Sequence, residues 1–209
     1  MLEVDVMGRS RVGRRLGLSF YQQSGDELAR ALIGKVLVHR VEGKELRGRI
    51  VETEAYLGPA DLASHSSKGR TKRTEIMFGR AGRAYVYFIY GMYEMFNIVA
   101  GKTGEAHAVL VRAAEPLDGW DADLSGPGKL ATRFGILRSD NGADLTGEKL
   151  FVLDSGDRPE IAVSARIGID YAGDWVDKPL RFFDAASDAV SRIPKRAARK
   201  TPQRRTHDK

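Results

Sequence analysis

Residues 49–59 read Arg49-Ile50-Val51-Glu52-Thr53-Glu54-Ala55-Tyr56-Leu57-Gly58-Pro59. The first half of this stretch alternates as a half-buried strand does, with β-formers at several positions. Gly58-Pro59 then predicts a turn that ends the strand. His65 follows a few residues later. The stretch therefore brings carboxylates, an aromatic ring and an imidazole to one end of a strand, where folds commonly present chemistry.

The sequence on either side predicts hairpins. A turn at 42–45 joins two strands, and Ser24 is a good N-cap for a helix that runs to Ile33 and is ended by Gly34. Strands grouped in hairpins predict an α+β fold: a single domain with a largely antiparallel β-sheet, peripheral helices and an aromatic β-hairpin. The predicted strands span 36–41, 46–56, 85–90, 93–100, 106–113, 150–153 and 161–167, and a second short helix spans 128–134.

The composition excludes several kinds of chemistry. The 209 residues include no cysteine, so disulfides, thiolate catalysis and cysteine-bound metals are ruled out. The four histidines are scattered, and no phosphate-binding glycine loop, dinucleotide motif or Gly-x-Ser-x-Gly elbow is present. We therefore expect neither a metal nor a cofactor. The sequence also lacks a signal peptide and an apolar span of about twenty residues, which predicts an intracellular protein of the cytoplasm and nucleoid, or of the nucleus in a eukaryote.

The net charge of +6 is concentrated at the chain ends. Residues 1–16 carry a net +2 and residues 195–209 a net +6, whereas residues 17–194 carry a net −2. We expect a disordered basic N-terminal tail over 1–16, a folded domain over 17–194 and a disordered basic C-terminal tail over 195–209. Within the domain, a glycine-bearing basic loop is suited to contacts with a phosphate backbone. Its predicted DNA-backbone residues are Lys68, Arg70, Lys72 and Arg73.

Residues 85–97 hold four tyrosines within nine positions and close with Asn97. Core packing explains any single tyrosine about as well as function does. Together with the basic loop and a carboxylate, however, the tyrosines supply the parts needed to stack a base, hold phosphates and activate water. Gly91 permits a sharp turn, so Tyr90 is expected to project from a hairpin tip.

Three interpretations of Glu52 and Glu54 remain open from the residues alone. The two share one face of the strand, so both can be exposed and solvated. They can also form the carboxylate pair of a glycoside hydrolase, which would need both residues. A general base would need one of them, and the strand end favours Glu54. A non-catalytic nucleic-acid-binding module would keep the tyrosines and be indifferent to Glu54→Gln.

Several motifs resemble the alkyladenine (3-methyladenine) DNA glycosylase family. The resemblance spans roughly residues 20 to 183, in the family's order. It is carried by Glu52-Thr53-Glu54-Ala55-Tyr56-Leu57-Gly58-Pro59, by residues 85–97, by Val111-Arg112-Ala113-Ala114-Glu115-Pro116, and by the later segments 125–130, 165–168 and 178–182.

The resemblance implies a monofunctional DNA glycosylase of base excision repair that works without a metal or cofactor. Glu54 would activate the water that attacks the sugar, and Arg112 would position both. Tyr56, His65 and Tyr87 would sandwich the flipped base, Asn97 would disfavour normal guanine, and Tyr90 would be the wedge of a hairpin inserted into DNA. The implied substrates are 3-methyladenine, 7-methylguanine, hypoxanthine and ethenoadenine, and the product is an abasic site. The implied partner is damaged DNA, with no membrane and no obligate protein partner, and we expect a monomer.

Overall fold

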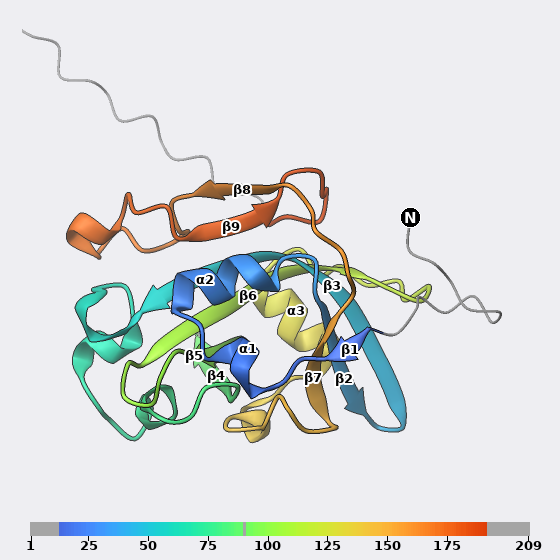
Figure 1. Cartoon of the computed structure of the whole chain (residues 1–209), viewed down its shortest axis with the longest axis horizontal. Helices are drawn as coiled ribbons and strands as arrows, with labels where there is room; N and C mark the ends of the chain where they lie inside the picture. The colour runs from blue at the N-terminus through green and yellow to red at the C-terminus, as the bar shows by residue number, and fades with distance from the viewer. Residues whose placement is uncertain (1–12, 90, 192–209) are drawn as a thin grey trace, which may run out of the picture.

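The computed structural model describes residues 13–89 and 91–191. Within them the strands form one nine-stranded sheet in which every pairing between strands is antiparallel. The main path runs β1-β7-β2-β3-β6-β5-β4, and β9 pairs with both β3 and β8 (Figure 1). The expected single domain with a largely antiparallel sheet is confirmed.

The elements have the following bounds. The helices are α1 Leu18–Tyr21, α2 Gly25–Leu32 and α3 Pro127–Phe134, with short 3₁₀ turns at Gly58–Ala60, His65–Lys68, Glu75–Phe78, Arg138–Asp140 and Gly173–Trp175. The strands are β1 Arg14–Arg15, β2 Val36–Val41, β3 Lys44–Leu57, β4 Ala84–Ile89, β5 Tyr93–Ala100, β6 His107–Pro116, β7 Leu150–Asp154, β8 Ile161–Ser164 and β9 Arg181–Asp184.

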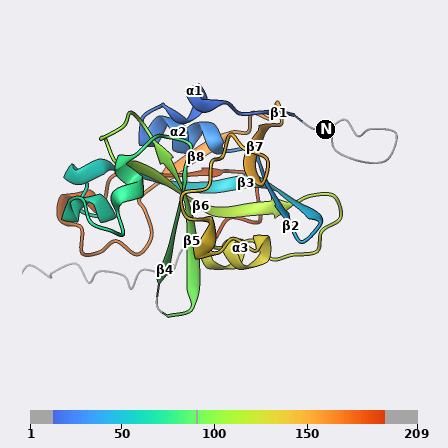
Figure 2. The ribbon, with the colours of Figure 1, turned by 90° about the horizontal axis from the view of Figure 1, so that it is seen from below.

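Strand β3 is the centre of the molecule, since it pairs with β2, β6 and β9 along its length. Helices α2 and α3 lie on opposite sides of β3 and β6 (Figure 2). The hydroxyl of Thr53 donates to the carbonyl of Ala29 in α2 at 2.8 Å, which fixes that helix to the strand. As a result, residues 50–55 are all buried, instead of alternating between core and solvent. Glu52 and Glu54 are both 0% exposed, so the interpretation in which they are solvated is wrong.

Helix α2 begins after Ser24, as the sequence predicts, and ends at Leu32, one residue before the predicted end. The backbone N–H of Ser24 donates to the Glu27 carboxylate at 3.1 Å, an arrangement typical of a capping box. Gly34, with φ of +84°, follows the last turn and reverses the chain into β2. Leu28 and Leu32 on its inner face are fully buried in the core that also contains Phe96 and Phe134.

The sequence placed some boundaries wrongly. The β2–β3 hairpin turns through two residues, Glu42 and Gly43, both at positive φ, and not through four. A two-residue turn of this kind matches the twist of the paired strands. Strands β1 and β9 were missed, because two and four residues are too few to show periodicity. Residues 13–16 are not part of a tail, since Arg14–Arg15 pairs with β7 and Leu16 is buried.

The predicted strand 161–167 ends at Ser164. Residues 165–167 leave the sheet, because Arg166 and Ile167 bond to β3 and the turn after it. No helix within 13–89 and 91–191 combines the length and the apolar character needed to cross a membrane. The predicted tails otherwise fall in 1–12 and 192–209, outside the described residues.

Candidate active site

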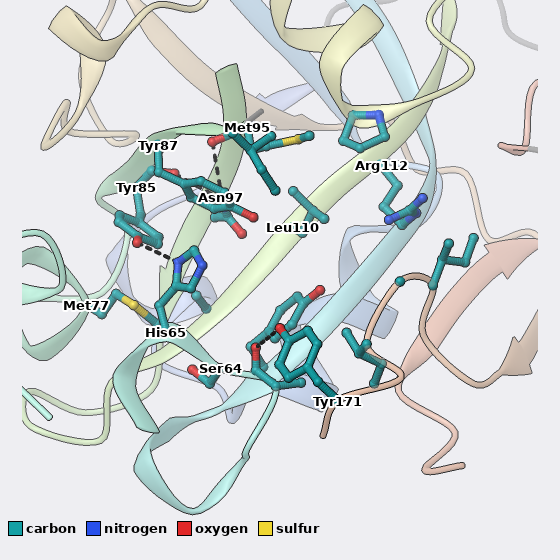
Figure 3. A pocket seen from close by; sticks show the side chains of 18 residues that line it. Ser64, His65, Met77, Tyr85, Tyr87, Met95, Asn97, Leu110, Arg112 and Tyr171 are labelled. Atoms are coloured by element: carbon teal, nitrogen blue, oxygen red, sulfur yellow. Dashed lines mark hydrogen bonds between the residues drawn. The ribbon is translucent and has the colours of Figure 1, made fainter. Parts of the chain in front are cut away.

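A pocket of about 270 Å³ opens where the end of β3, the β4–β5 hairpin, β6 and the loop at 167–171 meet. Its wall is largely aromatic and apolar. His65, Tyr85, Tyr87 and Asn97 gather at one end, and Arg112 lies at the other (Figure 3). Five of the predicted site residues line this pocket: Tyr56, His65, Tyr87, Asn97 and Arg112.

The aromatic end is held by ring contacts and one hydrogen bond. The ring centroids of His65 and Tyr87 are 4.5 Å apart, and those of Tyr85 and Tyr87 are 5.4 Å apart. Nδ1 of His65 lies 2.8 Å from the hydroxyl of Tyr85. Tyr85 and Tyr87 alternate with buried Val86 on β4, so the strand places both tyrosines on the pocket side. This wall is preformed to accept a flat ring.

Glu54 lies immediately behind the pocket wall and is 0% exposed. Its Oε2 accepts hydrogen bonds from the Tyr56 hydroxyl at 3.0 Å and from Arg112 Nη1 at 3.3 Å. Its Oε1 accepts the backbone N–H of Ile167 at 2.8 Å. The cation and these donors satisfy a carboxylate whose burial would otherwise be costly.

The strand geometry explains how Arg112 reaches that carboxylate. The β3–β6 register shifts on both sides of Glu52, so that Val51 and Arg112 have no directly opposite residue. Irregularities of this kind re-aim side chains and are common beside active sites. Burial alone would lower the pKa of Arg112, but the charges of Glu54 and Glu52 outweigh it and raise that pKa. Arg112 therefore stays a cation.

Three titratable rings of the pocket, those of Tyr56, His65 and Tyr87, are neutral. Burial, followed by the charge of Arg73, lowers the pKa of His65 to about 4. Burial, followed by the charge of Glu54, raises the pKa of Tyr56 well above its ordinary value. Burial is also the main reason that the pKa of Tyr87 is raised. Tyr56 is thus a hydrogen-bond donor to Glu54 throughout the physiological range.

Asn97 is held at the back of the pocket. Its Nδ2 donates to the carbonyls of Tyr85 and Met95 at 3.2 and 3.3 Å. Both amide hydrogens are therefore engaged by backbone, and Oδ1 is the atom left to meet a ligand.

The four predicted backbone contacts, Lys68, Arg70, Lys72 and Arg73, are all exposed on the loop beside the pocket. They are not equivalent. Arg73 lies 5.1 Å from the centroid of Tyr87 and 3.5 Å from Nε2 of His65, so it forms part of the pocket rim. Arg70 pairs with Glu75 at 3.2 Å. The predicted wedge, Tyr90, lies outside the described residues, although Met92 and Tyr93 beside it are exposed.

Sequence reasoning missed the residues that close the site from the C-terminal side. Arg166 pairs in two contacts with Asp61, at 2.6 and 2.9 Å, and its guanidinium lies 4.8 Å from the Tyr56 ring centroid. Arg181 and Ser191 bond to Glu52. The segments 165–168 and 178–182 carried a signal, because both belong to the resemblance, but the sequence alone indicates no role for them. Tyr171, also missed, lies at the pocket edge and is 71% exposed.

Within the described ranges, no group of three or more His, Cys, Asp or Glu residues is arranged to hold a metal ion. The chemistry that the site offers from its own residues is acid–base chemistry: one carboxylate, one fixed cation and a neutral aromatic chamber.

Comparison with known proteins identifies the reaction. Residues 19–188 match the family model described as "Methylpurine-DNA glycosylase (MPG)". A protein of Anaeromyxobacter sp. (strain Fw109-5) is 49% identical over 182 residues, covering 86% of this chain and 94% of its own. Proteins of Myxococcus xanthus (strain DK1622) and Methanocella arvoryzae (strain DSM 22066 / NBRC 105507 / MRE50) are 47% and 44% identical, covering 87% and 83% of this chain and 96% and 94% of their own. All three bear the name "Putative 3-methyladenine DNA glycosylase".

The protein is thus a DNA repair glycosylase, a hydrolase that acts on the N-glycosyl bonds of alkylated bases. The chain belongs to the methylpurine-DNA glycosylase family, and its activity is that of a DNA-3-methyladenine glycosylase. The resemblance seen in the sequence is confirmed.

Proposed function

We propose that the enzyme flips a damaged purine out of duplex DNA into the aromatic pocket and hydrolyses its N-glycosidic bond with water activated by Glu54. The product is an abasic site. The observation that carries this proposal is the position of Glu54, buried behind the pocket wall between Tyr56 and Arg112. Because its carboxylate is shielded from bulk solvent, it can activate only water held inside the pocket.

Binding begins with extrusion of the base, which costs a few kcal/mol and less for damaged or mispaired bases. Tyr56, His65 and Tyr87 then stack on the flipped base. A cationic base such as 7-methylguanine gains a further ~0.5–2 kcal/mol of cation–π attraction. Asn97, held in place by its two hydrogen bonds to backbone carbonyls, discriminates against normal guanine by leaving no room for the exocyclic amine of that base. The substrate range we propose is 3-methyladenine, 7-methylguanine, hypoxanthine and ethenoadenine.

The β4–β5 hairpin serves as the DNA-inserting element. Two exposed side chains, Met92 at 66% and Tyr93 at 42%, follow Gly91 at the turn, and the proposed wedge, Tyr90, precedes Gly91 in the sequence. Lys68, Arg70 and Lys72 on the neighbouring loop contact phosphates. Arg73, at the rim, meets the phosphates of the flipped nucleotide.

The glycoside hydrolase alternative is disfavoured by the contacts of Glu52. That carboxylate accepts four hydrogen bonds from protein donors, is 0% exposed and does not line the pocket, so a sugar bound in the pocket would not reach it. The binding module without catalysis, which would be indifferent to Glu54, is disfavoured because the chain belongs to a family of glycosylases.

The test is single-turnover release of hypoxanthine from duplex DNA by the wild type, Glu54→Gln and Glu45→Gln, with alkylated DNA as a second substrate. Glu45 is the matched control, since it lies on the same strand but is exposed and pairs only with Arg40 at 2.8 Å. We expect Glu54→Gln to release base about 10²–10⁴-fold more slowly with DNA affinity retained. Glu45→Gln should behave as the wild type. Release of base by Glu54→Gln at the wild-type rate would contradict the role proposed for Glu54.

A further inference from the structure

Glu52 is a fully buried carboxylate that the chemistry above does not use. Its Oε1 accepts hydrogen bonds from Arg181 Nε at 2.6 Å, from the Ser191 hydroxyl at 2.8 Å and from Arg112 Nε at 3.1 Å. Its Oε2 accepts the backbone N–H of Ser191 at 2.7 Å. Every partner except Arg112 comes from residues 181–191, which therefore fold over β3 to complete this cluster.

Arg112 is shared between the two glutamates. Its Nε goes to Glu52, its Nη1 goes to Glu54 at 3.3 Å, and its Nη2 lies 3.5 Å from the Ser191 hydroxyl. Three different nitrogens thus have three different partners. This arrangement fixes the rotation of the guanidinium and allows it only one N–H contact with Glu54.

The single contact matters because of what it leaves available on Glu54. An ionised carboxylate offers about four acceptor positions. Three of those on Glu54 are occupied by Tyr56, Arg112 and the Ile167 N–H. Arginine and carboxylate groups frequently pair bidentately. A guanidinium released from Glu52 could rotate into that geometry and take the fourth position.

We propose that Glu52, together with Arg181 and Ser191, is a positioning cluster that holds Arg112 in single contact with Glu54 and so keeps one carboxylate lone pair open for the proton of the attacking water. The proposal rests on the function proposed for Glu54. Glu52 is a positioning residue, since it acts through Arg112 and touches no reacting atom.

The first experiment compares Glu52→Gln with Glu115→Gln. Glu115 is a close match, because it pairs with Arg49 at 2.7 Å and accepts the Ser187 hydroxyl at 2.5 Å, yet it contacts neither Arg112 nor Glu54. In single-turnover release of hypoxanthine we expect Glu52→Gln to be about 10- to 100-fold slower, the effect of a small misplacement in a catalytic geometry. Its dissociation constant for the DNA should change less than about twofold, and Glu115→Gln should change neither quantity by more than about twofold.

A double-mutant cycle with Arg112→Lys separates positioning from general structural support. A lysine cannot span both carboxylates. If Glu52 acts through Arg112, adding Glu52→Gln to Arg112→Lys slows release less than about twofold further, whereas independent effects multiply. The proposal is overturned if the double variant is slowed by the product of the two single-variant factors. It is also overturned if Glu52→Gln and Glu115→Gln slow release equally.

Glu52→Gln leaves Arg181 buried without its charge partner, so it can fail to fold. Ser191→Ala then carries the test, since it removes a hydroxyl that touches Glu52 and Arg112 without unpairing a charge. We expect release slower by about three- to tenfold at unchanged DNA affinity. An unchanged rate for Ser191→Ala overturns the proposal. If the wild type itself releases no base, the proposed function fails. If Glu54→Gln is slow but Glu52→Gln and Ser191→Ala release base at the wild-type rate, this inference fails and the proposed function stands.

Discussion

At the scale of single residues, Asp61 shapes the site although it does not line the pocket. It accepts the backbone N–H groups of Leu57 and Ala63, each at 3.0 Å, which fixes the turn after β3. It also pairs with Arg166, and both side chains of this ion pair are 0% exposed. Arg166 in turn supports the outer face of Tyr56. One carboxylate therefore links the turn, the C-terminal segment and a pocket wall.

Asp61→Asn should lower the free energy of unfolding by about 3–5 kcal/mol, because it leaves Arg166 buried without a counter-charge. In a chain of this size that corresponds to a melting temperature lower by roughly 6–20 °C. Glu75→Gln is the control, since its pair with Arg70 is more than half exposed on both sides and should be worth less than about 1 kcal/mol. Urea and thermal unfolding of the two variants measure the difference, and equal losses would contradict the prediction.

His65 provides a second prediction at this scale, through its pKa of about 4 against an ordinary 6.5. The folded protein takes up this proton only near pH 4, whereas the unfolded chain takes it up near 6.5. The stability contributed by the neutral ring is therefore complete above about pH 6.5 and is lost as the pH falls toward 4. An NMR titration of the imidazole should show a midpoint near 4. Arg73→Gln should raise this midpoint only part of the way toward 6.5, because burial is the larger cause of the shift. A midpoint near 6.5 in the wild type would refute this account.

At the scale of elements, β3 ends sharply because of Gly58. This glycine has φ of +75°, and a Cβ there would lie 2.4 Å from the carbonyl oxygen of Glu105. The turn can therefore bring residues 61–65 back beside the strand end only if this position has no side chain. The placement of His65 in the pocket depends on that close approach between two backbones.

Gly58→Ala should destabilise the protein more than Gly43→Ala. Both glycines have φ near +70°, so both substitutions cost about 1–2 kcal/mol of backbone strain. A Cβ at Gly43, however, would meet no atom within 4 Å, whereas a Cβ at Gly58 adds a clash with backbone. We expect the loss at Gly58 to exceed that at Gly43 by at least about 1 kcal/mol in urea unfolding. Base release should also slow at Gly58→Ala alone.

At the scale of the whole molecule, charge and chemistry are separated along the chain. The domain that carries the pocket is close to neutral, with a net −2 over residues 17–194, while residues 195–209 carry a net +6. We therefore expect long-range attraction to DNA to depend strongly on the C-terminal residues, and selection of the base to depend on the pocket.

Deletion of 195–209 should flatten the salt dependence of DNA binding, because each phosphate contact contributes about 0.9 to the slope of log K against log salt. Residues 1–12 form the control deletion, since Arg9 and Arg11 balance Glu3 and Asp5. We expect the slope to fall by about 2–5 for the C-terminal deletion and to stay unchanged for the N-terminal one. Fluorescence anisotropy across a salt series measures both. Single-turnover release at saturating protein should be the same for all three forms, and parallel slopes would contradict the prediction.

The sequence by itself determined most strands of the sheet, helix α2 and the residue types of the pocket. These depend on local periodicity, on turn chemistry and on motifs in a fixed order, all of which can be recognised without knowing which residues are in contact. Only the tertiary structure distinguished the surroundings of Glu52 from those of Glu54, which share one strand face and one residue type. The two differ because Glu52 accepts bonds from Arg181 and Ser191, whereas Glu54 accepts one from the Ile167 N–H. Those donors lie 113 to 139 residues further along the chain, and hydrogen bonds over such separations are fixed by packing, not by any local pattern.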